Sequence, residues 1–374
     1  MSPYAHITGW GMAVPERVLT NHELATMVDT SDEWIRTRTG ICERRIASED
    51  QTTASLATEA ALRALAVAGL NPADVELIIV STSSPEHTFP ATACIVQDRI
   101  GATKAGAFDL LAACTGFIYA LNMAAQSIRS GSVKNALVIG AETLSRLVNW
   151  QDRNTCILFG DGAGAFVLQA GEERSGVLSS VLRSDGSGSD LLTLPAGGSA
   201  LPASLETVRD GLHYIHMNGR EVFRFATRVM TQATLEAVAR ANLSMDDIQL
   251  IIPHQANQRI IEMAARSLNF PMERCVMNLD RYGNTSTASI PIATCEAAQQ
   301  GRLHPGDKVV FVGFGSGLTW GAVVAEWSAP FSAQRREYPT RYRLYARVRS
   351  ALLRLLRRLD TLIDALVWDR RQRD

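Results

Sequence analysis

The chain has 374 residues, 46% of them hydrophobic and 20% charged, a composition typical of a folded enzyme with a sizeable core. Its formal net charge is only −1, but residues 331–374 hold twelve arginines and five acidic residues, or +7, which leaves −8 for the rest. An acidic body argues against a nucleic-acid-binding protein.

The chain shows no targeting or membrane signal. The first residues do not show a basic stretch followed by an apolar one, and the sequence has no run of about 18 apolar residues. We therefore expect neither a secretory signal nor a membrane span. Its six cysteines are scattered without a C-x-x-C pair. This spacing predicts reduced thiols in the cytoplasm and no metal site.

Predicted helices alternate with short apolar strands along the chain. A helix over 57–69 precedes a segment over 70–81 that carries an apolar run, and a buried strand before Phe108 precedes a helix over 118–125. A strand at 136–140 follows. The strands lack polar alternation, which is typical of strands covered by helices on both faces.

The same pattern returns downstream at a constant spacing. A helix over 231–242 leads to a strand at 250–253, and Ile248, just before that strand, matches Val75. The segment 309–313 matches 136–140, and both offsets are 173. A shared offset predicts a duplicated α/β unit. We place the halves at residues 1–171 and 172–328. An irregular stretch runs from Ser184 to about Asn218, and the regular pattern of the second copy begins there.

Cys114 lies at a predicted strand-to-helix turn among small residues. Unpaired N–H groups and the positive end of the helix dipole at such a turn favour the thiolate, the reactive form of cysteine. On this stretch alone, a small buried cysteine filling a gap in the core explains the residue equally well.

Three further segments contain candidate catalytic groups, each weakly indicated when taken alone. His254 follows the strand at 250–253, Asn284 lies in a turn rich in glycine and serine, and the loop 313–317 has backbone N–H groups that an oxyanion could use. Turn capping and close packing explain each of them separately. Because Cys114, His254 and this loop all follow predicted strands, we expect one shared pocket between the halves.

Several motifs occur together, in order. They are Ser31-Asp32-Glu33-Trp34-Ile35, Arg38-Thr39-Gly40-Ile41, Ala113-Cys114-Thr115-Gly116-Phe117, Phe159-Gly160-Asp161-Gly162-Ala163-Gly164-Ala165, His254-Gln255-Ala256-Asn257, Tyr282-Gly283-Asn284-Thr285-Ser286 and Leu318-Thr319-Trp320-Gly321. Over roughly residues 4–327 the chain thereby resembles β-ketoacyl-acyl-carrier-protein synthase III, the condensing enzyme that starts bacterial type II fatty acid synthesis. The resemblance implies an α/β class with a thiolase-like duplicated αβαβα layered fold, to which this chain adds a C-terminal amphipathic helical extension.

The resemblance also implies the catalytic roles. Cys114 would take the acyl group from acyl-coenzyme A (acyl-CoA), and His254 with Asn284 would bind the thioester carbonyl of malonyl-acyl carrier protein (malonyl-ACP). Donors at that oxygen stabilise the enolate left by loss of CO₂. The backbone N–H groups of Cys114 and Ser316 would hold the tetrahedral oxyanion; Ser316 stands where many relatives have glycine.

Substrate contacts follow from the same resemblance. Trp34 and Arg153 would sandwich the adenine of coenzyme A, Arg38 would hold its nucleotide end, and Arg259 would meet the acidic acyl carrier protein. No cofactor is expected beyond the two substrates.

Met217 and Phe89 would line the acyl pocket, with Phe89 reaching across the interface of a homodimer. For Met217, simple core filling remains an alternative.

Residues from about 329 to 374 depart from the family pattern. A helix is predicted over 342–368, and its apolar face comprises Leu344, Val348, Leu352, Leu355, Leu359, Ile363 and Leu366. The rest is rich in arginine: Arg343, Arg347, Arg349, Arg354, Arg357 and Arg358. The favoured interpretation is that this face docks on the body or on a dimer partner. Peripheral contact with an anionic membrane, or binding of a partner such as the carrier protein, are the alternatives.

Other functions compete with condensation as explanations of these motifs. A relative in secondary metabolism with another starter or acceptor is the nearest alternative. A thiolase or hydroxymethylglutaryl-type synthase calls for a second acid–base cysteine or a glutamate, for which the sequence offers no convincing candidate. A non-catalytic scaffold would not need Cys114, His254 and Asn284 together. The sequence does not specify starter length or branching.

Overall fold

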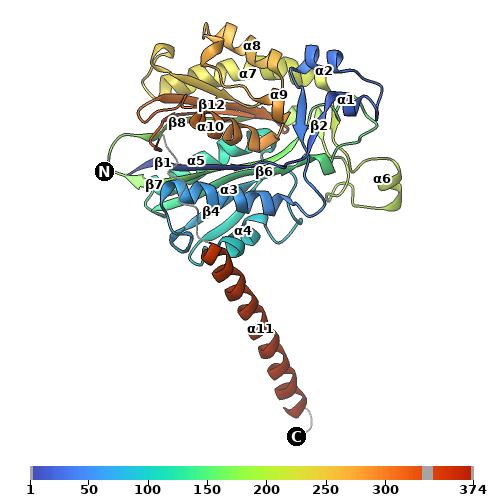
Figure 1. The fold of residues 1–374 in the computed structure, drawn as a ribbon, viewed down its shortest axis with the longest axis vertical. Coiled ribbons are helices and arrows are strands. Elements are labelled where there is room, and N and C mark those ends of the chain that lie inside the picture. Colours follow the sequence, from blue (N-terminus) through green and yellow to red (C-terminus); the bar gives the residue numbers. More distant parts are fainter. Residues whose placement is uncertain (1–2, 331–339, 372–374) are drawn as a thin grey trace.

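Two stacked β-sheets, with helices between them and on both outer sides, form the body of the protein (Figure 1). A computed structural model describes residues 3–330 and 340–371, with the side chains of the second segment described over 344–361. Helices α5 and α10 lie between the sheets, α3 and α4 cover the first sheet, and α7 and α8 cover the second. The predicted layered α/β fold is confirmed.

The strands and helices have the following bounds. The first sheet, in the order β1–β7–β6–β4–β5, comprises β1 (Tyr4–Ala13), β4 (Leu77–Ser81), β5 (Gly106–Leu110), β6 (Asn135–Thr143) and β7 (Asp161–Gly171). The second, in the order β11–β12–β13–β8, comprises β8 (Gly176–Ser184), β11 (Leu250–Pro253), β12 (Lys308–Gly315) and β13 (Thr319–Glu326). Two small pairs join β2 (Val18–Thr20) to β3 (Glu43–Arg45) and β9 (Leu192–Thr193) to β10 (His216–Met217). The α-helices are α1 (Asn21–Leu24), α2 (Asp32–Thr39), α3 (Thr53–Ala68), α4 (Thr92–Ile100), α5 (Gly116–Arg129), α6 (Leu205–Arg209), α7 (Gly219–Arg240), α8 (Gln258–Ser267), α9 (Leu279–Tyr282), α10 (Ser289–Gln299) and α11 (Thr340–Arg371).

The two sheets repeat one another in register. In the first, β4 runs parallel to β6 with Ile78 opposite Leu137; in the second, β11 runs parallel to β12 with Ile251 opposite Val310. Both partners are displaced by 173 residues, the offset found in the sequence. The second sheet has no counterpart of β5 among the described strands, only a single bridge between Ile251 and Cys275.

Two sequence expectations about the second half need correction. Helix α7 begins at Gly219, twelve residues before the predicted start at 231, because the Asn218 side chain caps its first turn through the N–H of Glu221. Strand β8 already belongs to the second sheet, so this sheet begins before the irregular stretch rather than near Asn218. The boundary between residues 171 and 172 stays a prediction.

Aromatic packing joins the halves in the layer between the sheets. The Phe166 ring of β7 lies 5.0 Å from Phe117 of α5, 5.7 Å from Phe311 of β12 and 5.9 Å from Trp327. All four side chains are buried. Such edge-to-face contacts add to the free energy gained from burying the rings, so the position of α5 is fixed by both halves.

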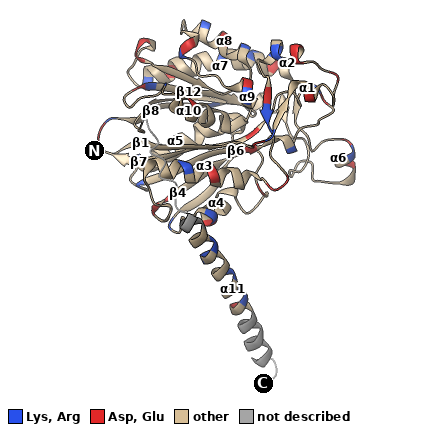
Figure 2. Cartoon of the chain, viewed as in Figure 1, with Lys and Arg blue, Asp and Glu red and all other residues tan. Residues whose placement is uncertain are grey.

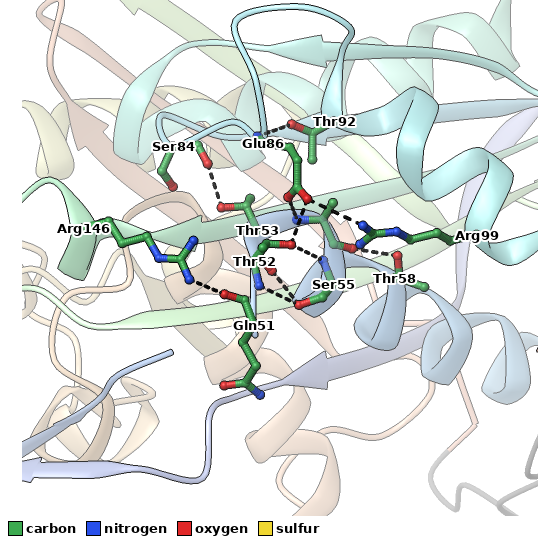
Figure 3. A network of polar contacts seen from close by, with 11 residues as sticks. Gln51, Thr52, Thr53, Ser55, Thr58, Ser84, Glu86, Thr92, Arg99 and Arg146 are labelled. Atoms are coloured by element: carbon green, nitrogen blue, oxygen red, sulfur yellow. Dashed lines mark hydrogen bonds and ion pairs between the residues drawn. The ribbon is translucent and has the colours of Figure 1, made fainter. Parts of the chain in front are cut away.

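A polar network fixes α4 to the start of α3 (Figure 3). The Glu86 carboxylate accepts hydrogen bonds from the Thr52 hydroxyl and the Ala54 N–H, and it pairs with Arg99 of α4 at 3.5 Å. The Glu86 N–H donates in turn to the Thr92 hydroxyl at the start of α4. These bonds hold the loop before α4, and with it the base on which α11 sits.

The C-terminal helix is longer than predicted, and its apolar face does not dock on the body. Of the predicted face, Leu344, Val348, Leu352, Leu355 and Leu359 are 44–61% exposed, so docking on this chain's own body is wrong for the described residues. The helix contacts α4 through small residues on its other side instead, because only these allow close approach. The side chains of Arg343, Ile363 and Leu366 lie outside the described residues.

Candidate active site

Cys114 lies where β5 gives way to α5, as predicted, in a single turn of 3₁₀ helix over Ala113–Thr115. The turn is closely packed. A Cβ atom on Gly116 would lie 2.0 Å from the Ser81 hydroxyl oxygen, and one on Gly315 would lie 2.8 Å from the Cys114 nitrogen. Glycine is therefore required at both positions, and the Gly315 strand end lies directly against the backbone of the cysteine.

The Cys114 thiol is buried, and burial raises its pKa to about 12. Hydrogen bonding with the Ser286 side chain, and to a smaller extent with the Cys114 backbone, lowers this pKa. In the free enzyme, burial therefore raises the pKa by more than these contacts lower it, and the thiolate expected from the turn does not form. Cys114 rests as a thiol, and its proton has to leave when the sulfur attacks.

Glu142 and Ser286 lie beneath Cys114, and sequence reasoning missed both. Glu142 is the second-last residue of the buried strand β6. It accepts hydrogen bonds from the Ser84 hydroxyl and the Ser83 N–H, and burial raises its pKa to about 7. Hydrogen bonding with Ser286 lowers the pKa of both Cys114 and Glu142. The sequence pattern that could have revealed Glu142 is a single acidic residue near the end of the otherwise uncharged strand β6.

His254 is buried directly after β11 and is held as a neutral ring. Burial lowers its pKa to about 3, and its Nδ1 lies 2.7 Å from the Ser289 Oγ at the start of α10. That oxygen also accepts the Gln255 N–H at 3.3 Å, so its own proton is available for Nδ1. This arrangement favours the tautomer with the ring proton on Nε2, in which His254 is a donor toward the pocket.

We expect Ser289→Ala to lower the condensation rate about tenfold, since it removes the hydrogen bond that selects this tautomer. Acylation of Cys114 by acyl-CoA should be unchanged. Steady-state condensation and single-turnover acylation measure the two effects. Ser289→Thr keeps the hydroxyl and should restore most of the rate; loss of acylation in Ser289→Ala as well would contradict a role specific to His254.

Asn284 presents its amide to the same pocket in a fixed orientation. Its Oδ1 accepts the Ser286 N–H at 2.8 Å, and its backbone exchanges hydrogen bonds with Leu158 and Gly160. With the oxygen engaged, the Nδ2 group is left to donate. Asn284 therefore offers a second hydrogen-bond donor beside that of His254.

A pocket of about 90 Å³ brings these groups together. Cys114 comes from the turn before α5 in the first half. The second half contributes His254, Asn284, Gly315 at the end of β12 and Met217 at the end of β10. The rest of the lining is mostly apolar: Leu158, Phe159, Leu192, Val222, Phe223, Ile260, Phe314 and Leu318. One nucleophile and two neutral donors in a small apolar pocket suit acyl transfer and the stabilisation of an enolate.

Comparison with known proteins identifies the family. A model described as 3-oxoacyl-[acyl-carrier-protein (ACP)] synthase III matches residues 108–186, and the model of its C-terminal part matches residues 238–327. The β-ketoacyl-[acyl-carrier-protein] synthase III of Symbiobacterium thermophilum is 59% identical over 321 residues, covering 86% of this chain and 97% of the relative. That of Roseiflexus sp. is 54% identical over 88% of this chain and 100% of the relative.

The chain belongs to the β-ketoacyl-[acyl-carrier-protein] synthase III family.

Solved structures agree with this assignment. The 3-oxoacyl-[acyl-carrier-protein] synthase III of Aquifex aeolicus is 47% identical with a TM-score of 0.80, covering 86% of this chain and 100% of that one. The priming β-ketosynthase of the R1128 polyketide pathway is 34% identical with a TM-score of 0.82, covering 88% and 98%.

In this synthase III family member, the residues predicted to bind coenzyme A form a cluster at α2. Arg38 and Arg153 both lie over the Trp34 ring, with their guanidinium carbons 4.6 and 4.7 Å from its centre. Arg153 also donates to the Asp29 carbonyl. A base stacked between Trp34 and Arg153 needs about 7 Å, twice an ordinary contact distance. The predicted adenine sandwich therefore requires Arg153 to move aside.

The remaining predicted site residues are spread around the pocket. Arg259 is exposed at the start of α8, 5.7 Å from the ring of Phe223 in the pocket wall. Ser316 bonds through its hydroxyl to the Leu192 carbonyl. Phe89 is 85% exposed and does not line the pocket of its own chain. Within the described residues, no cluster of His, Cys, Asp and Glu is suited to a metal ion.

Proposed function

We propose that this chain catalyses the initiating condensation of type II fatty acid synthesis, with Cys114 carrying the acyl group. The observation that carries the proposal is the shared pocket of Cys114, His254 and Asn284. In the first step the Cys114 sulfur attacks the carbonyl carbon of acyl-CoA, with acetyl-CoA the expected starter. The carbon–sulfur bond to coenzyme A breaks, and the thiol proton passes to the departing sulfur. The backbone N–H groups of Cys114 and Ser316 stabilise the oxyanion.

In the second step, malonyl-ACP binds with its thioester oxygen on the Nε2 of His254 and the Nδ2 of Asn284. Loss of CO₂ leaves an enolate whose negative charge these two donors stabilise. The enolate carbon attacks the acyl group and expels the Cys114 sulfur, which takes up a proton. The products are β-ketoacyl-ACP, coenzyme A and CO₂. The neutral state of His254 supports this role, because a neutral ring donates one N–H without needing a counter-ion in an apolar pocket.

The experiment that tests both steps uses radiolabelled acyl-CoA and malonyl-ACP with the full-length chain. Acyl-CoA alone should label the protein in a single stoichiometric burst, and later addition of malonyl-ACP should chase the label into β-ketoacyl-ACP. A protein that is never labelled would exclude the proposal.

Acyl carrier protein is proposed to dock beside α8, with Arg259 as its electrostatic contact. Reversing this charge in Arg259→Glu should raise the KM for malonyl-ACP about tenfold, because charge complementarity governs encounter with an acidic partner. Labelling by acyl-CoA should stay the same. Arg209→Glu on α6, which is also an exposed arginine, is the matched control; an equal KM change in both variants would refute a specific contact.

A second candidate is priming of a secondary-metabolic pathway with a different starter, favoured by the likeness to the R1128 priming β-ketosynthase. Rates with a panel of straight and branched acyl-CoA starters distinguish the two. A marked preference for acetyl-CoA supports fatty acid initiation, whereas a preference for longer or branched starters supports the second candidate.

We further propose a homodimer, the division into halves 1–171 and 172–328 followed by the extension 329–374, and an acyl pocket bounded by Met217 and completed by Phe89 from the partner. The exposure of Phe89, and of Phe108 and Leu111 at the open edge of β5, supports a partner on that side. The cytoplasmic location stays a prediction. No helix among residues 3–330 and 340–371 has the length and apolarity to cross a membrane.

A further inference from the structure

Helix α11 rests on α4 with one end and then extends away from the body (Figure 1). Its contact is small. Ala346 and Ser350 are buried, the Ser350 hydroxyl donates to the Asp98 carboxylate at 2.6 Å, and Ala346 lies beside Gly101 at the end of α4. At 1.5 Å per residue, its 32 residues extend for about 48 Å. The contact to α4 thus holds only the first part of the helix.

The apolar side of α11 faces away from α4 toward solvent. At about 100° per residue, Leu344, Val348, Leu352, Leu355 and Leu359 share an arc of about 80°, opposite the buried pair. All five are 44–61% exposed. Soluble monomers rarely leave a continuous apolar stripe of this length uncovered, so the stripe requires an occupant.

The arginines of α11 carry uncompensated positive charge beside this stripe (Figure 2). Over 344–361 the helix holds five arginines and one acidic residue, Asp360. Arg347, Arg354 and Arg358 lie along one border of the stripe and Arg349 lies at the other, from the same helical geometry. None of the five pairs with a described carboxylate.

We propose that α11 binds an anionic lipid surface, with its apolar stripe at the acyl boundary and its arginines among the headgroups. Basic amphipathic helices of low overall hydropathy bind in this way without crossing the bilayer. A second copy of α11 fits the stripe less well. If two α11 helices paired through their stripes, Arg349 and Arg358 at the stripe borders would lie near arginines of the other copy, with no acidic partner there.

Helix α11 is separate from the synthase III body in sequence and lies far from the α8 surface. The family match ends at residue 327, and the full lengths of relatives fit within 86–88% of this chain, so α11 is an addition to the synthase III body. Helices α7 and α8 lie on the opposite side of the body from α11 (Figure 1). Lipid bound to α11 therefore leaves the α8 surface uncovered.

Co-sedimentation of the full-length protein with vesicles tests the proposal. Wild type should pellet with phosphatidylcholine vesicles containing about a third phosphatidylglycerol, pellet weakly with phosphatidylcholine alone, and be released by about 0.5 M salt. Leu352→Glu/Leu355→Glu should abolish pelleting. Arg354→Gln/Arg358→Gln should lower the partition coefficient about 25-fold, near fivefold per charge.

Matched changes on α6, Leu205→Glu and Arg209→Gln, should leave vesicle binding unchanged, as both side chains are exposed there too. All variants should keep wild-type condensation activity without vesicles, which reports folding independently of binding. Equal pelleting of wild type and the α11 variants overturns the proposal. So does concentration-dependent self-association in ultracentrifugation without lipid that the leucine variant removes, since the occupant is then a second copy.

Discussion

Replacing Cys114 with serine is expected to lower acyl transfer from acyl-CoA by at least about 10³-fold, to the point where no labelled protein is isolated. The position is buried, and its neighbours do not include a strong base: His254 has its pKa lowered to about 3. A serine hydroxyl is far harder to deprotonate than the thiol it replaces, so burial at this turn penalises it more. Gel-filtered protein after a pulse of radiolabelled acyl-CoA, with peptide mapping by mass spectrometry, measures the effect.

Cys94→Ser provides the control, because Cys94 is an exposed free cysteine outside the pocket. It should label to the same extent as wild type. Equal labelling of Cys114→Ser would show that another residue carries the acyl group and would remove the proposed mechanism.

Replacing Asn284 with alanine, or His254 with alanine, should lower the condensation rate about 10²- to 10³-fold, because each change removes one of two donors to the enolate oxygen. Acylation of Cys114 should remain within a few-fold of wild type. The double variant should lose less than the product of the two single losses, since both donors serve one oxygen. Release of labelled CO₂ from malonyl-ACP reports the decarboxylation directly; a variant that loses acylation and decarboxylation in parallel would contradict the division of roles.

The neutrality of His254 adds a pH signature to this prediction. Its pKa of about 3 places its titration far below neutrality, so the condensation rate should show no ionisation from His254 between about pH 5 and 9. In the unfolded chain histidine binds a proton near pH 6.5. The unfolded state thus binds more protons, and the free energy of unfolding falls as the pH drops from about 6.5 toward 3. His254→Ala should show a shallower fall between pH 7 and 5.

The fold was predictable from the chain because duplication and burial leave regular traces in a sequence. A common offset of 173 predicted two units, and the paired registers of β4–β6 and β11–β12 carry the same offset. The position of Cys114 at a strand-to-helix turn was equally local, as was the helical character of α11. The start of α7 was missed because a polar first turn, capped by Asn218, carries no apolar period.

The electrostatic state of the site depended on tertiary contacts instead. Residues far apart in sequence make the environment of each group: the Ser289 hydroxyl lies 2.7 Å from the His254 Nδ1, and Glu142 raises the pKa of Cys114. Local sequence predicted a thiolate at the helix start, but burial by both halves outweighs that effect. Arg153 on Trp34 is likewise a contact across more than a hundred residues.

By itself, then, the sequence determined the duplicated layered architecture, the family and the three residues proposed for chemistry, because each depends on local pattern or on motifs in fixed order. Only the tertiary structure decided which side of α11 meets the body and which protonation states the pocket imposes. Both depend on what surrounds a side chain in space. The helix turns Ala346 and Ser350 toward α4 because small side chains permit close contact, and this leaves its leucines exposed.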